Sequence, residues 1–114
     1  MFKDMLGKSS KTTEEAYIHD FKGHFVPQTD FAARYSIIIE GTKKPLFIDI
    51  QGQTFEIHYG QEENIDVYAK LTPEVMEHII RGSMTFQRAF MTGEMTAKGN
   101  FKTLRMLDSA FTFA

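Results

Sequence analysis

The residues of this chain that could do chemistry are four histidines, a few serines and two carboxylates within predicted strands. His19 and His24 are five positions apart, and His58 and His78 stand in different predicted elements, so the spacing matches no zinc signature. Ser83 lies outside any G-x-S-x-G elbow, and the sequence places no histidine or acid beside it. We therefore expect no nucleophilic serine, no metal and no organic cofactor.

Asp49 and Asp66 are the carboxylates embedded in predicted strands. A carboxyl group in an apolar cavity can have a raised pKa and act as a general base. Both residues fall on the polar positions of alternating strands, so catalysis is not the favoured interpretation. The eight glycines form no dinucleotide fingerprint or phosphate loop, and they predict turns and helix ends instead.

The apolar composition is the unusual feature of the chain. It has eleven Phe and no Trp, and five of its seven Met lie between positions 76 and 106. Methionine is flexible and polarizable, which suits a surface that binds ligands of varied shape, but it also fills ordinary hydrophobic cores. Composition and periodicity leave both interpretations open.

Length and charge limit the class of protein. Residues 1–114 include no low-complexity segment and no cysteine, and they predict a single domain large enough to bury a core without disulfides. Thirteen basic and fifteen acidic residues are spread along the chain and give a net charge of −2. Nucleic acid is therefore not an expected partner, because phosphate binding needs a clustered basic surface.

The N-terminal segment has no apolar run long enough for a signal peptide or a membrane span. Residues 1–12 are expected to fray or to dock locally. The alternative is a transient membrane contact through Phe2, Met5 and Leu6, which share one small helical face near lysines. We expect a soluble, cytoplasmic protein.

The first half of the chain changes from a helical period to a period of two. Residues 13–25 carry apolar side chains at helical spacing, and Pro27 ends this predicted helix. Apolar and polar residues then alternate in four predicted strands, which are residues 31–40, 46–51, 55–59 and 65–71. Because these strands follow one another like hairpins, they predict an antiparallel sheet with one face covered.

Helix signals begin at Thr72. Thr72 is a good N-cap, Pro73 suits the first helical position, and Gly82 supplies a stop, so residues 73–81 are expected to be helical. The apolar residues of this segment share one face and its charged residues share the other. This is the most strongly signalled helix in the chain.

Two further helices and a strand complete the pattern. Thr85 predicts the cap of a two-turn helix that Gly93 ends, and residues 94–99 alternate as a short strand. Asn100 predicts the cap of a last helix that carries apolar residues at helical spacing as far as Phe111. The order of elements predicts an α+β domain whose five-stranded sheet is covered on one face by helices.

The stretch from 65 to 111 carries a specific combination of motifs. An alternating strand leads through a threonine into a helix that ends at Gly82, and "AFMTGEMTAKGN" at 89–100 precedes the last helix. This combination resembles the sterol carrier protein 2 (sterol transfer) family, including the gap-free spacing of Gly82, Gly93 and Gly99. Glu94 departs from the lysine that is common at its position.

The resemblance implies a five-stranded sheet covered on one face by helices, with an apolar cavity between the layers for lipid, fatty acyl chains or sterol. Part of the Met and Phe surface would then line that cavity. The candidate lining residues lie on the inward faces or at the joins of the covering helices. They are Ile79, Met84, Phe86, Phe90, Met91, Met95, Leu104, Leu107 and Phe111.

The function that the resemblance implies is non-enzymatic binding and carriage of a fatty acid, acyl-CoA or sterol. Two alternatives remain open. One is a small cavity enzyme for an apolar substrate, which requires Asp49, Asp66 or a histidine to point inward. The other is an interaction module whose apolar face is buried against another chain or a copy of itself. The chain ends "FTFA" and not in the Leu-terminated tripeptide of peroxisomal family members, which also favours the cytoplasm.

Overall fold

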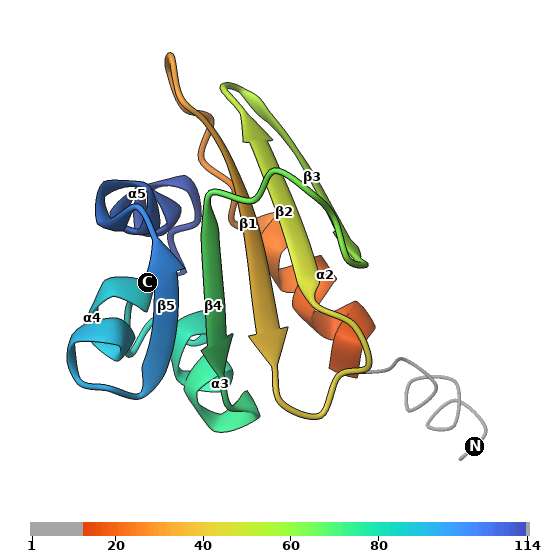
Figure 1. Ribbon diagram of the computed structural model, residues 1–114, viewed down its shortest axis with the longest axis vertical. Helices are drawn as coiled ribbons and strands as arrows, with labels where there is room; N and C mark the ends of the chain where they lie inside the picture. Colours follow the sequence, from red (N-terminus) through yellow and green to blue (C-terminus); the bar gives the residue numbers. More distant parts are fainter. Residues whose placement is uncertain (1–12, 114) are drawn as a thin grey trace, which may run out of the picture.

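The alternating segments form a five-stranded sheet (Figure 1). The computed structural model describes residues 13–113, so the predictions for residues 1–12, including Phe2, Met5 and Leu6, lie outside the described residues. The strands lie in the order β3-β2-β1-β4-β5 across the sheet. They are β1 (Ala32–Ile39), β2 (Leu46–Gln51), β3 (Thr54–Tyr59), β4 (Val67–Leu71) and β5 (Met95–Gly99).

One pair of neighbouring strands is parallel. In β1 and β4, Tyr35 lies opposite Val67 and Ile39 lies opposite Leu71, whereas the other neighbours are antiparallel. The prediction of a wholly antiparallel sheet was therefore wrong. Residues 60–66 look like a hairpin turn in the sequence, but they carry the chain back to the Tyr35 end of β1 before β4 begins, and this return makes β4 parallel to β1.

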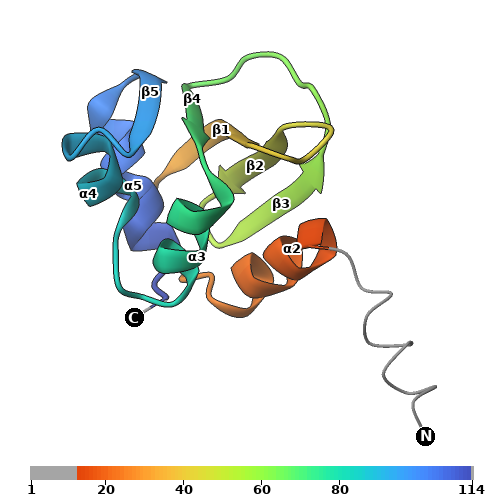
Figure 2. The same cartoon turned by 90° about the horizontal axis from the view of Figure 1, so that it is seen from below.

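The helices lie on one face of the sheet, as predicted (Figure 2). Within residues 13–113 they are α2 (Thr13–Gly23), α3 (Pro73–Ile80), α4 (Phe86–Met91) and α5 (Phe101–Ala110). The three predicted caps are confirmed, because the side chains of Thr72, Thr85 and Asn100 accept backbone N–H bonds at the starts of α3, α4 and α5.

The core lies between the sheet and the helices. On β1, the inward side chains of Ala33, Tyr35, Ile37 and Ile39 are buried, which matches the predicted alternation. Strand β2 departs from this pattern, since five consecutive residues from Leu46 to Ile50 are buried. Side chains of the two neighbouring strands explain this, because Arg34 of β1 pairs with Asp49, and Arg34 and His58 of β3 both pack against Phe47 on the outer face.

Two glycines with positive φ shape the region around β5. Gly93 follows α4 and has φ +82°, which confirms the predicted left-handed stop. Gly99 ends β5 with φ +125°, and a Cβ there would lie 2.1 Å from the carbonyl oxygen of Asp66. Gly99 thus allows β5 to approach the start of β4 more closely than any other residue would.

We predict that Gly99→Ala destabilises the fold more than Gly93→Ala. A Cβ at Gly93 meets no atom within 4 Å, so that variant should lose only the roughly 1–2 kcal/mol of left-handed backbone strain. Gly99→Ala also forces β4 and β5 apart and should lose about 3 kcal/mol or more. Urea denaturation of both variants measures this difference, and equal losses would contradict the close approach.

Candidate functional site

The layer between helices and sheet gathers most of the predicted lining residues. Six of the nine are buried there, namely Ile79, Phe86, Met95, Leu104, Leu107 and Phe111. Two more, Met84 and Phe90, are partly buried against the same core. The structure therefore brings eight of these residues into one apolar layer, while their contact with a ligand stays a prediction.

Met91 is the exception, with 73% of its surface exposed. It is the last residue of α4, and the buried residues of that helix are Phe86 and Ala89. At 100° per residue, Met91 points almost opposite to Ala89. Met91 thus faces solvent in this structure, at an open cleft on α4 and not in the apolar layer, and its contact with a ligand stays a prediction.

A small recess opens at the edge of the apolar layer, beside the end of α3. Its volume is about 110 Å³, and it includes three predicted residues, Ile79, Met84 and Phe111. Pockets for small organic ligands usually have about 300–1,000 Å³, so a long acyl chain needs more room than the recess offers. The other lining residues are Gly82, Thr85, Asp108, Thr112 and Phe113.

Packed phenylalanine rings lie behind the recess. The ring centroid of Phe21 lies 5.0 Å from that of Phe111 and 5.3 Å from that of Phe113, both edge-on. The ring centroid of Phe25 lies 5.5 Å from that of Phe111 and 4.4 Å from that of Phe55. Sequence reasoning placed Phe21 and Phe25 on an apolar helix face but did not connect them with the C-terminal residues, although the repeated Phe of "FTF" was a usable signal.

The last described residues form one wall of the recess and are held by few backbone bonds. The N–H of Val26 donates to Ala110 O at 2.7 Å, and the N–H of Thr112 donates to His24 O at 3.2 Å. These bonds flank the isolated β-bridge between Phe25 and Phe111. The wall is therefore attached to the residues after α2 by a short bridge and by ring contacts, and not by an extended strand.

Asp108 lies at the rim of the recess and joins α5 to α4. Its two carboxylate oxygens accept the N–H groups of Phe86 and Gln87 at 2.8 and 2.9 Å. Burial raises the pKa of Asp108, and these backbone hydrogen bonds act in the opposite direction. Because both oxygens are engaged, Asp108 is a structural anchor for the first turn of α4.

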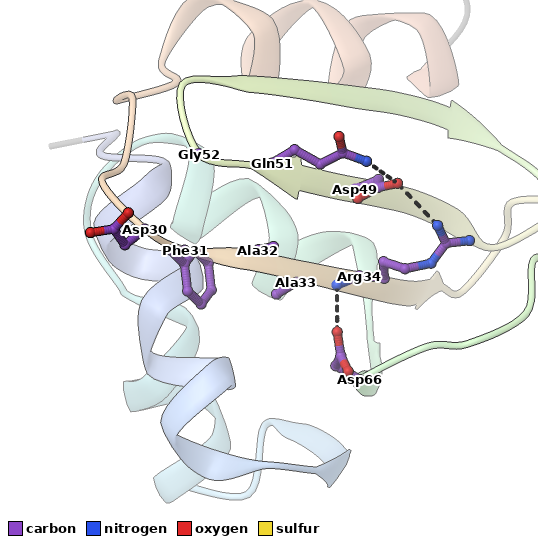
Figure 3. Close-up of a pocket in the computed structure, with 9 residues that line it drawn as sticks. All are labelled: Asp30, Phe31, Ala32, Ala33, Arg34, Asp49, Gln51, Gly52 and Asp66. Atoms are coloured by element: carbon purple, nitrogen blue, oxygen red, sulfur yellow. Dashed lines mark hydrogen bonds and ion pairs between the residues drawn. The ribbon is translucent and has the colours of Figure 1, made fainter.

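A second, polar cleft of about 590 Å³ lies on the outer face of the sheet (Figure 3). There Arg34 Nη1 lies 3.0 Å from Asp49 Oδ2, and Nη2 donates to Glu63 O at 3.0 Å. The guanidinium also lies over the Phe47 ring, 4.9 Å from its centroid. Asp66 accepts the backbone N–H of Arg34 at 2.8 Å.

The polar cleft contains both carboxylates that the sequence offered as candidate general bases. Asp49 and Asp66 both lie on the outer face, away from the apolar layer, as their polar positions predicted. Asp49 is nevertheless only 7% exposed, because the Arg34 side chain and the neighbouring strands cover it. Its ion pair with Arg34 joins β1 to β2, so its local role is structural.

Among the histidines, His24 lies beside the recess, because its exposed ring is 5.0 Å from that of Phe113, and its Nδ1 lies 2.8 Å from Asp20 O. His19 is exposed on α2. The ring of His58 lies 3.4 Å from Glu56 and 3.1 Å from Glu62 on the outer side of β3, and His78 is exposed on α3. Within residues 13–113, no three His, Asp or Glu side chains are placed to hold a metal ion. In the same range, no helix is both long and apolar enough to cross a membrane.

Comparison with known proteins decides the family. The family model of the SCP-2 sterol transfer family matches residues 27–112, which include all five strands and every predicted lining residue. The chain belongs to the SCP-2 sterol transfer family. Among curated proteins, no sequence matches the chain significantly.

Solved structures with the same fold include carriers and part of an enzyme. The crystal structure of Sterol Carrier Protein 2 Like 2 from Aedes aegypti has a TM-score of 0.64 at 17% identity, covering 85% of this chain and 94% of that chain. The solution structure of palmitated SCP2L2 from the same organism has a TM-score of 0.58 at 16% identity. The match covers 69% of this chain and 71% of that chain.

The inverting sec-alkylsulfatase Pisa1 from Pseudomonas sp. also matches, with a TM-score of 0.61 at 17% identity over 70% of this chain. The match covers only 13% of the length of that enzyme. At these identities the structural likeness shows the fold alone. The α+β fold predicted from the sequence, with its sheet covered on one face, is therefore confirmed.

We predict that Asp108→Ala lowers the free energy of unfolding by about 1–3 kcal/mol, because the N–H groups of Phe86 and Gln87 lose their acceptors. Asp108→Asn is the matched control, since it keeps the shape and one acceptor oxygen and should lose less. Chemical denaturation measures both variants. An unchanged unfolding free energy in Asp108→Ala would show that water replaces the carboxylate without loss.

Proposed function

We propose that this protein is a non-enzymatic carrier that binds a lipid-like molecule, with its apolar chain inserted between the helices and the sheet. One observation above all supports the proposal. Ile79, Met84 and Phe111, which were selected as lining residues from the family resemblance, meet at a recess that borders the phenylalanine-rich core. The environment is apolar, which matches the chemistry of a fatty acid, an acyl-CoA or a sterol, and the recess has to widen to admit any of them.

The positions of the ionisable groups favour a carrier over a cavity enzyme. An enzyme acting in the apolar layer needs Asp49, Asp66 or a histidine to point inward. Both aspartates lie on the opposite face of the sheet, and Asp49 is paired with Arg34. Asp108 reaches the recess, but both of its oxygens already accept backbone hydrogen bonds. His24 contacts Phe113 at the recess from an exposed position, and its Nδ1 lies 2.8 Å from Asp20 O.

Binding energy is sufficient even if the interior must rearrange. A chain of ~14 carbons gains roughly 11 kcal/mol gross at about 0.8 kcal/mol per buried methylene, before ordering and lost overall motion are subtracted. The ligand displaces side chains, since the recess is small. We infer that the wall formed by Phe111 to Phe113 moves to admit the ligand, because a short bridge to residues 24–26 and ring contacts hold it, and not an extended strand.

We predict saturable binding of an environment-sensitive fatty-acid probe by the purified full chain. Unlabelled long-chain fatty acid, acyl-CoA or sterol should displace the probe, and the order of displacement would identify the ligand class. Native mass spectrometry of freshly purified protein should show a co-purified lipid. Absence of saturable binding across all three classes would overturn the carrier proposal.

We further predict that Phe113→Ala accelerates exchange of the bound probe, because it removes the ring that packs against Phe21 at the recess. Stopped-flow displacement measures the rate. The matched control is Phe111→Ala, which truncates a fully buried ring and should instead lower stability by about 3–5 kcal/mol. An unchanged exchange rate in a folded Phe113→Ala variant would mean that ligands enter elsewhere.

A further inference from the structure

Two large apolar side chains are exposed on α4 and α5, two helices that contact each other. Met91 at the end of α4 is 73% exposed, and Phe101 at the start of α5 is 59% exposed. Helices α4 and α5 and strand β5 form one side of the molecule, away from β3 (Figure 1). We refer to residues 86–110, which span these three elements, as the α4–β5–α5 corner.

Rigid local structure presents these side chains outward. Asn100 caps α5 and so fixes Phe101 as its first residue, while the Phe101 ring stacks at 5.1 Å on the partly buried Phe90. Met91 is followed by the Thr92 cap and by the left-handed turn at Gly93. The exposure of both residues thus follows from the ends of regular elements, and not from a loose segment.

The corner is basic although the chain is acidic. It contains four basic and two acidic residues, a net charge of +2, which leaves nine basic and thirteen acidic residues elsewhere, a net charge of −4. The four basic residues are all exposed, and none of them has an ion pair with a carboxylate among the described residues. They are Arg88, Lys98, Lys102 and Arg105.

The basic side chains are also positioned around the apolar ones. Arg88 lies three residues before Met91 on α4, and Arg105 lies four residues after Phe101 on α5. Each pair therefore shares a helix face. An exposed aromatic or methionine side chain beside Lys or Arg is the combination that inserts into a bilayer interface, since the cations contact lipid headgroups while their stems and the apolar groups lie deeper.

We propose that the α4–β5–α5 corner docks the protein on the surface of an anionic membrane, with Phe101 and Met91 inserted among the headgroups. Charge complementarity selects an anionic lipid surface as the partner. The net negative charge of the remaining molecule then orients it away from the bilayer, so that the corner alone makes contact. This docking surface is separate from the recess and does not depend on the proposed carrier function.

The test is flotation of the full chain with large unilamellar vesicles. One set contains phosphatidylcholine only, and the other contains about one third phosphatidylserine, a composition that gives a negative surface potential. The wild-type chain should float with the anionic vesicles and should be released by added salt. The variant Lys102→Gln/Arg105→Gln should bind roughly 25-fold more weakly, at about fivefold for each charge, and Phe101→Ala about tenfold more weakly.

Matched controls separate the corner from general charge and hydrophobicity. Lys43→Gln/Lys44→Gln removes two exposed charges from the loop between β1 and β2, and Ile38→Ala trims a 42% exposed side chain of the outer sheet face. Both controls should bind anionic vesicles like the wild type. Far-UV circular dichroism and the denaturation midpoint of every variant confirm that it is folded.

Several outcomes overturn the proposal. These are no flotation of the wild type, equal weakening by the control variants, full binding by the corner variants, or a Phe101-dependent dimer in analytical ultracentrifugation that leaves vesicles unbound. The fatty-acid probe separates this proposal from the carrier function. Phe101→Ala should bind the probe normally in vesicle-free solution, and a wild type that floats but binds no probe would contradict the carrier proposal alone.

Discussion

Asp66 holds the two halves of the sheet together. Its backbone N–H donates to the carbonyl of Arg34, and its side chain accepts the N–H of the same residue, both at 2.8 Å. This reciprocal pair sets the start of β4 beside β1 and thereby fixes the parallel register. On the other side, the carbonyl of Asp66 leaves room only for Gly99, so β5 and the helices next to it depend on the same residue.

The local signals in the sequence were sufficient for most elements because each rests on neighbouring residues. The caps at Thr72, Thr85 and Asn100 and the stop at Gly93 need only a short stretch of chain, and all occur as predicted. The direction of β4 was not predictable, because residues 60–66 resemble a turn whichever way the chain continues. The path depends on a contact with a strand some thirty positions earlier.

The burial of the candidate site residues could be predicted from local residue spacing, but only in part. Helical spacing identified the buried residues of α3 and α5, whereas Met91 shows that a six-residue helix gives too few turns to define its inner face. Two features depended wholly on tertiary structure. The burial of Asp49 needs Arg34 from the adjacent strand, and the phenylalanine cluster joins α2 to the last residues of the chain.

The uneven charge of the molecule has a consequence for its handling. The chain has an overall charge of −2 and a sequence pI of about 6.1. From this net charge alone, it should not bind to a cation-exchange resin at neutral pH. The basic side at α4 and α5 lies away from Glu14 and Glu15 in the first turn of α2 (Figure 1), so the molecule has an electric dipole. Its retention on charged resins and its orientation in an electric field then follow the dipole as well as the net charge.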